Sequence, residues 1–195
     1  MENKKKTKKR ELISPRFPCP PSRFPLIAKN PKINYPCAME LKELYREILN
    51  EHNINPEHKT SLPDANITLQ GVNPSCGDNI TLNLKVDDNG KIADGSFTGS
   101  GCAISQASCD MMLDCVIGKT KDEALSLSEN FMKMIQGTAT EEEIEELDEA
   151  SALKDIKHMP SRVKCAELGW RTMSEMLHDH KTTMNVKNQH PDCSI

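Results

Sequence analysis

The chain has eight cysteines, and these are the side chains best suited to metal binding or sulfur chemistry. They stand at Cys19, Cys37, Cys76, Cys102, Cys109, Cys115, Cys165 and Cys193. No two of them form a CxxC pair, so zinc-finger and thioredoxin-like motifs are absent. We expect no secretory signal, because no apolar run follows the basic start of the chain. Metal or thiol chemistry is therefore favoured over a disulfide framework.

Three short segments are predicted to form an antiparallel sheet. Residues 79–87 alternate between apolar and polar side chains, which is the pattern of a strand with one buried face. Residues 91–98 follow directly after Asn89-Gly90, a pair that favours a tight hairpin turn. Residues 66–72 are apolar enough to form a further strand before them.

The connectivity of this sheet brings three candidate ligands to one end. The first strand leads into the loop that holds Cys76 and Asp78, and the third strand leads to Cys102. Glycines in both loops allow the backbone to bend tightly and approach an ion. Cys102 precedes a predicted helix and Cys165 lies in the first turn of another, where the helix N-terminus favours a thiolate.

Thiolates together with one carboxylate are ligands for four-coordinate zinc, and soft ligands favour zinc or iron–sulfur over calcium or magnesium. The alternative for each cysteine is a buried small hydrophobic residue. We favour this alternative for Cys109 and Cys115, because both lie in an apolar helical segment. Cys19, Cys37 and Cys193 fall in tails predicted to be disordered, and we assign them no role.

Helices are predicted for most of the remaining chain. Apolar residues at helical spacing predict helices over 39–52, 103–117 and 161–179. Capping boxes that begin at Thr120 and Thr140 predict two more helices, the second very acidic and with its acidic face in solvent. A sheet followed by helices is typical of the α+β class, here a small three-stranded antiparallel sheet covered by helices.

The two ends of the chain differ from its centre. Residues 1–38 hold ten basic and two acidic residues and seven of the twelve prolines, a composition that predicts a disordered extension. Translation from Met39 is an alternative, since the better helix begins there. Residues 181–195 are polar and predicted to be a flexible tail. The folded domain is therefore expected over 39–180.

The composition also argues against several classes of protein. No segment approaches the roughly 18 apolar residues that cross a bilayer, so we expect no membrane association and a cytoplasmic protein. Residues 39–195 hold 15 basic and 27 acidic residues, and this negative balance argues against nucleic-acid binding.

Three segments resemble the signature segments of the IscU/NifU-like iron–sulfur cluster assembly proteins. They are NPSCGD at 73–78, GSGCAIS at 99–105 and RVKCAELGW at 162–170, and each contains one cysteine. The resemblance extends from about Leu41 to Leu177. It implies an IscU/NifU N-terminal-like fold for the whole predicted domain.

Within this family the sequence is most similar to the SufU branch. The interval from Cys102 to Cys165 is 63 positions, longer than in IscU proper, and contains the predicted acidic helix. IscU proper also has a histidine directly before its last cysteine, where this chain has Lys164.

The resemblance to SufU implies a zinc site and a role in sulfur transfer. The residues that match the ligands of the single zinc ion are Cys76, Asp78, Cys102 and Cys165. Cys76 would accept sulfur from the persulfide of a SufS-type, PLP-dependent cysteine desulfurase, after a partner histidine replaces it on the zinc. The sulfur would then pass to a downstream Suf cluster scaffold. Arg162 matches a basic position that would steady a thiolate or persulfide, with a solvated charge as the alternative.

Two other functions remain open. The same four residues would bind a [2Fe–2S] cluster in an IscU-like scaffold, although Lys164 in place of histidine argues against it. A structural zinc adaptor is the third hypothesis. Tyr45 and His52 match the helix on which the desulfurase docks in the family. Surface or core roles are expected for five histidines that lie outside the motifs, namely His52, His58, His158, His178 and His180.

Overall fold

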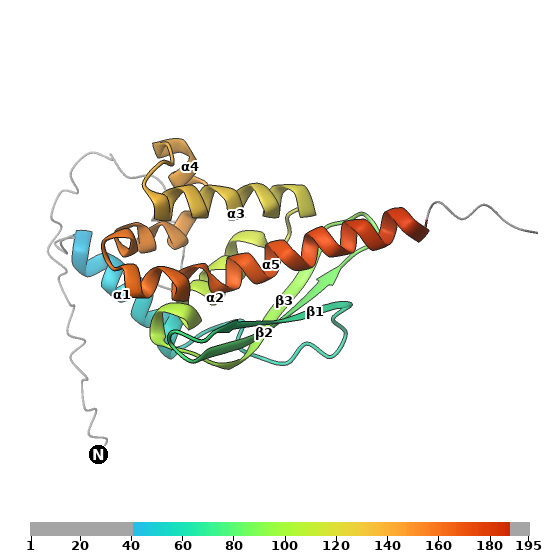
Figure 1. Cartoon of the computed structure of the whole chain (residues 1–195), viewed down its shortest axis with the longest axis horizontal. Helices are drawn as coiled ribbons and strands as arrows, with labels where there is room; N and C mark the ends of the chain where they lie inside the picture. The colour runs from blue at the N-terminus through green and yellow to red at the C-terminus, as the bar shows by residue number, and fades with distance from the viewer. Residues whose placement is uncertain (1–40, 188–195) are drawn as a thin grey trace, which may run out of the picture.

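The computed structural model describes residues 41–187 (Figure 1). Its elements, in chain order, are α1 (Leu41–Ile54), β1 (Ile67–Asn73), β2 (Asp78–Val86), β3 (Ile92–Ser100), α2 (Ala103–Val116), α3 (Lys121–Gln136), α4 (Glu141–Glu145), the 3-10 helix η2 (Asp148–His158) and α5 (Pro160–Lys187). The extension predicted over residues 1–38 lies outside the described residues.

The three strands form one antiparallel sheet in the order β1-β2-β3, as the sequence predicts. The side chains of Ile80, Leu82 and Leu84 on β2 are buried, and the residues between them are more exposed. The hairpin turn between β2 and β3 contains Gly90, whose φ of 77° is readily adopted by glycine. Alternation and turn chemistry therefore fix the sheet, and its strand ends differ from the prediction by one or two residues.

Helices cover one face of the sheet, which confirms the α+β architecture. α5 runs along the sheet, and α3 lies on the far side of α5 (Figure 1). Phe131 of α3 stacks on Trp170 of α5 with ring centroids 4.5 Å apart, and both side chains are fully buried. The core is otherwise aliphatic and rich in methionine, consistent with the few aromatic residues in the sequence.

Both predicted capping boxes are present, at Thr120 before α3 and at Thr140 before α4. The single acidic helix predicted after Thr140 is wrong in form. α4 ends after five residues, and the chain continues as the 3-10 helix η2. The spacing of the apolar residues explains this change of helix type. A 3-10 helix has three residues per turn, so it places every third side chain on the same face. The side chains at that spacing are buried, namely Leu147, Ala150, Leu153 and Ile156.

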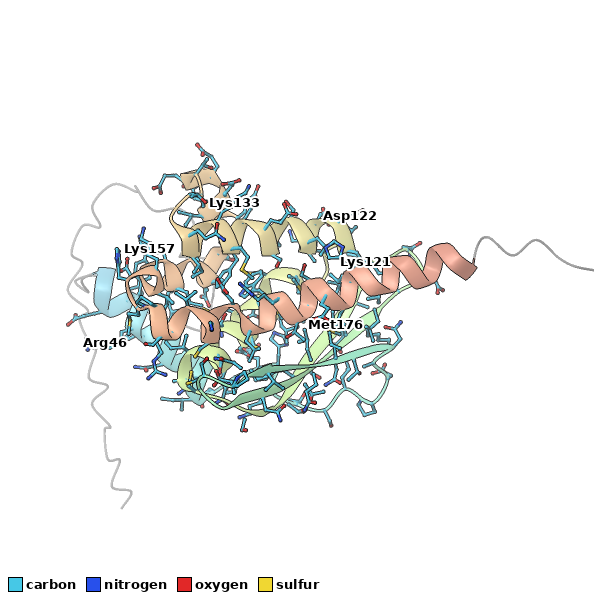
Figure 2. All side chains as sticks on the ribbon, in the orientation of Figure 1. Arg46, Lys121, Asp122, Lys133, Lys157 and Met176 are labelled. Atoms are coloured by element: carbon cyan, nitrogen blue, oxygen red, sulfur yellow. The ribbon has the colours of Figure 1, made fainter. Side chains whose placement is uncertain are left out.

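α4 itself has no buried residue, so its acidic side chains face solvent as predicted. An ion pair fixes it to the helical layer, since Lys133 Nζ lies 2.5 Å from Glu143 Oε1. Figure 2 shows Lys133 on α3 at the side that α4 approaches.

α5 extends beyond the helix predicted over 161–179 and reaches Lys187, because no glycine or proline interrupts it after Gly169. Residues 181–187 of the predicted tail are helical, and residues 188–195 lie outside the described part. Across residues 41–187, no helix is both long and apolar enough to pass through a lipid bilayer.

Candidate metal and sulfur site

The hairpin between β1 and β2 positions the first two candidate ligands. Its loop is closed by the carbonyl oxygen of Asn73, which accepts hydrogen bonds from the backbone N–H groups of Cys76 (3.2 Å) and Gly77 (2.9 Å). Gly77 has a φ of 75°, in the left-handed region that glycine tolerates best. Asn73 pairs with Asp78 across the ladder, so Cys76 stands on the loop and Asp78 opens β2.

The other two candidate ligands come from helix starts. Cys102 is the N-cap residue of α2, and Cys165 lies in the second turn of α5. The thiol sulfurs of Cys76, Cys102 and Cys165 and a carboxylate oxygen of Asp78 all lie within 4.8 Å of one another. Asp78 and Cys165 are fully buried, whereas Cys76 and Cys102 are half-buried. The structure thus gathers the four residues that the sequence motifs single out.

Three donors fix the Asp78 carboxylate inside the site. Oδ1 accepts hydrogen bonds from the backbone N–H of Cys102 (2.7 Å) and from Ser105 Oγ (3.1 Å). Oδ2 accepts one from Asn73 Nδ2 (2.9 Å). Burial alone would raise the pKa of Asp78, but these hydrogen bonds outweigh it and lower the pKa. Asp78 is therefore ionised and held in one orientation.

Asn73 and Ser105 contact the candidate ligands, although the sequence analysis did not single them out. Asn73 Nδ2 also lies 3.4 Å from the sulfur of Cys165, so one amide group contacts two candidate ligands. Ser105 Oγ contacts the carbonyl oxygen of Cys102 in addition to Asp78. Both residues lie inside the segments at 73–78 and 99–105 that resemble the family signatures, and this position was the signal in the sequence. The structure shows that both side chains are buried.

The pKa values of two of the thiols are shifted in opposite directions. Burial would raise the pKa of Cys102, but hydrogen bonds from the backbone and side chain of Ser105 outweigh this and lower it. Burial raises the pKa of Cys165 strongly, and its hydrogen bonds to Asp78, Cys76 and Cys102 act in the same direction. Of these two thiols, Cys165 therefore holds its proton more strongly.

Arg162 contacts the site from the first turn of α5. Its Nη1 donates a hydrogen bond to the sulfur of Cys76 at 3.3 Å. The negative charges of Cys76 and Cys102 raise the pKa of Arg162, so the guanidinium remains charged. Arg162 thus places a fixed positive charge against the Cys76 sulfur.

The donor set fits a zinc ion. Three sulfurs and one carboxylate match the four ligands of a tetrahedral site, and soft sulfur donors favour zinc or an iron–sulfur centre. The convergence of these donors also fits, because a divalent ion would replace the thiol proton of Cys165 and offset the negative charge of Asp78. The outer hydrogen bonds to Asp78 are of the kind that orient metal ligands.

The other described cysteines do not belong to this site. Cys109 is fully buried, and burial raises its pKa to about 12. Cys115 donates a hydrogen bond from its thiol to the carbonyl oxygen of Leu147 (3.1 Å), and burial raises its pKa to about 12 as well. Both thiols are neutral, in agreement with the packing role predicted for them.

The three histidines between α1 and α5 also lie apart from the cysteine site. His52 is a core histidine, 7% exposed, and contacts Asp110 and Glu149. His58 contacts Asp114, and His158 is exposed. Tyr45 on α1 faces the ammonium group of Lys154, which lies 5.0 Å from the ring centroid.

A groove of about 590 Å³ lies beside the Cys76 loop. One side is formed by Asn73, Pro74 and Ser75, and α5 forms the other. Lys157 and Lys164 line this groove, and Figure 2 shows Lys157 projecting from the end of η2. The position that holds histidine in IscU proper is thus occupied here by an exposed lysine.

Known proteins are similar to this chain in sequence and in fold. The chain is 40% identical to the "Iron-sulfur cluster assembly scaffold protein IscU" of Streptococcus pyogenes, over 76% of this chain and 94% of the relative. It is 38% identical to the "Zinc-dependent sulfurtransferase SufU" of Bacillus subtilis, over 69% and 90%. The crystal structure of a putative iron–sulfur cluster assembly scaffold protein for the SUF system from Fervidobacterium islandicum is similar with a TM-score of 0.62 and 35% identity, over 71% and 99%.

The family model of the NifU-like N-terminal domain matches residues 44–186, which include all four candidate ligands. The match covers nearly the whole described part of the chain, and the relatives are matched over most of their own length. The chain therefore belongs to the NifU-like N-terminal domain family, within the IscU/NifU-like group of iron–sulfur cluster assembly proteins.

Proposed function

We propose that this protein acts in iron–sulfur cluster assembly as a zinc-dependent sulfurtransferase, accepting persulfide sulfur from a SufS-type cysteine desulfurase at Cys76. The observation that carries the proposal is the environment of Cys76. It is a half-buried thiol on a hairpin loop, in hydrogen-bond contact with Arg162 and beside three further donors. The relatives named for cluster assembly and for zinc-dependent sulfur transfer support the same role.

Sulfur transfer to Cys76 requires no external oxidant. The Cys76 thiolate attacks the outer sulfur of the desulfurase persulfide, and a new S–S bond forms as the old one breaks. The desulfurase cysteine leaves as a thiolate. The reactants and the products therefore each contain one thiolate and one persulfide, and no net oxidation occurs. Arg162 would orient the attacking sulfur and then stabilise the negative charge of the terminal persulfide sulfur.

All four candidate ligands have a part in the proposed zinc site. Cys76, Asp78, Cys102 and Cys165 would hold one zinc ion, which would keep the thiols deprotonated without redox chemistry of its own. Asp78 is a harder donor than the thiolates. Its three hydrogen bonds keep it in place while Cys76, on the loop, is free to meet the partner.

A second candidate function is a scaffold that assembles a [2Fe–2S] cluster on the same four residues. Three convergent thiols and the scaffold names of several relatives favour it. Lys164, which replaces the histidine donor of IscU proper, disfavours it. In the sulfurtransferase proposal, the sulfur passes instead to a downstream Suf cluster scaffold.

The test is cysteine-dependent sulfide release by a SufS-type desulfurase, with and without the zinc-loaded full chain. We expect strong stimulation, which Cys76→Ser abolishes. Cys115→Ser is the matched control, because this thiol is protonated and serine can donate the same hydrogen bond to Leu147. Full stimulation by Cys76→Ser would refute the proposal. No stimulation together with a stable cluster after anaerobic reconstitution would favour the scaffold.

A further inference from the structure

A second group of metal-type donors lies on the helical side of the molecule. It consists of His52 of α1 and of Asp110 and Asp114 of α2, and one donor atom from each lies within 4.8 Å of the other two. Asp110 follows Cys102 by eight positions along α2, which separates the two residues by about 12 Å of helix rise. The group is therefore distinct from the cysteine site.

The spacing of these donors suits a single ion. His52 Nδ1 lies 2.8 Å from Asp110 Oδ2 and 3.8 Å from Asp114 Oδ2. Neighbouring ligands of a tetrahedral zinc ion, with bonds of about 2.0–2.1 Å, are separated by about 3.3 Å. The two observed distances bracket this value, so small side-chain movements would bring all three donors into range.

Each of the three donors has an outer partner that fixes its orientation. The other ring nitrogen of His52, Nε2, lies 2.8 Å from Glu149 Oε2 on η2. Metal-binding histidines commonly contact a carboxylate in this way, which directs the free nitrogen to the ion. Asp110 Oδ1 accepts the backbone N–H of His58 (2.8 Å), and Asp114 Oδ1 lies 3.0 Å from His58 Nε2.

Two of the three donors are buried, and the third is accessible to solvent. Asp110 is fully buried in a helix that otherwise packs into the core, and His52 is nearly so. The Asp114 side chain is 44% exposed, so an ion can enter beside it and keep water in a remaining position. The carboxylates of Asp110, Asp114 and Glu149 outnumber the two histidines, and this excess negative charge favours a cation.

We propose that His52, Asp110 and Asp114 form a second metal site, which binds a divalent first-row ion of the zinc type with at least one coordination position open to water. Imidazole and carboxylate donors suit zinc, cobalt and iron(II), and three protein ligands with an open position are typical of accessible sites. The bound ion replaces the proton on His52 Nδ1 and connects α1 to α2. This site does not depend on the sulfur-transfer function.

The test is a cobalt(II) titration of the full chain, followed by optical spectroscopy and by metal analysis after dialysis. Cobalt in the cysteine site gives an intense thiolate charge-transfer band, whereas cobalt held by nitrogen and oxygen gives weak d–d bands alone. We expect a second equivalent without a charge-transfer band. Asp114→Asn should weaken this equivalent at least 10-fold and leave the charge-transfer band unchanged.

Two exposed positions provide matched controls. Asp64→Asn removes an exposed aspartate that pairs with Lys85, and His158→Gln removes an exposed histidine; neither should change the second equivalent. His58→Gln should weaken it less than Asp114→Asn, because His58 only orients Asp114. Thermal melting checks that each variant folds. One equivalent per chain, or a second equivalent that Asp114→Asn does not weaken, would overturn the proposal.

Discussion

Replacing Asn73 by alanine would test how much the candidate site depends on its outer hydrogen bonds. The Asn73 side chain is buried and donates to both Asp78 Oδ2 and the Cys165 sulfur, while its own oxygen accepts the backbone N–H of Ser75. A hydrogen bond to a charged group contributes about 1.5–3 kcal/mol, and the weaker contacts contribute less. We therefore expect Asn73→Ala to lower the free energy of unfolding of the metal-free protein by about 2–3 kcal/mol.

The same substitution should also weaken zinc binding. Loss of an outer hydrogen bond to a metal ligand typically lowers metal affinity 10–100-fold. The assays are urea denaturation in the presence of a chelator and zinc competition with a chromophoric chelator. Asn79→Ala on β2 is the matched control, since its side chain is exposed and accepts a hydrogen bond from Gln70 at the surface. Its effect should stay within about 0.5 kcal/mol. If the two variants behaved alike in both assays, the role assigned to Asn73 would be wrong.

Three further substitutions address the sulfur chemistry and the fold. Arg162→Ala should reduce stimulation of the desulfurase while zinc content stays constant, and Arg162→Lys should restore part of it. Lys119→Ala, which removes an exposed lysine after the end of α2, should change neither quantity. Gly169→Ala should destabilise the protein by about 1–3 kcal/mol, because its new Cβ would lie 2.5 Å from the Cys109 sulfur; Cys109→Ala should then recover much of the loss in thermal melts. Thr140→Ala removes the capping box of α4 and should cost about 1 kcal/mol in urea denaturation, and an unchanged midpoint would speak against it.

The sheet and the gathering of Cys76, Asp78 and Cys102 at one end of it could be predicted because their signals are local. Alternation over 79–87 and the turn at Gly90 define one hairpin, and the hairpin connectivity brings Cys76 and Cys102 to the same end. The approach of Cys165 could be inferred only from the family resemblance, since it depends on how α5 packs against the sheet.

The features that were missed depend on contacts between distant parts of the chain. The partners of His52 are 58 and 97 positions away, at Asp110 and Glu149, so its pattern on α1 gave no sign of them. Burial would lower the pKa of His52, but hydrogen bonds and charge from both carboxylates raise it to about 9. The length of the acidic helix was mispredicted because helix propensity alone ignores the burial of every third residue from Leu147 to Ile156.

The burial of η2 limits which segments can be deleted among related proteins. Leu147, Leu153 and Ile156 fill space between α1, α2, α3 and α5, and each apolar side chain of this size contributes about 1.5–3 kcal/mol when fully buried. Residues 147–156 are therefore part of the core, not a loop added to its surface. A shorter homologue cannot simply omit them, because it must also remodel the helix faces that they cover. Deletions in this segment should act first on folding, and should affect the proposed sulfur transfer only through the loss of folded protein.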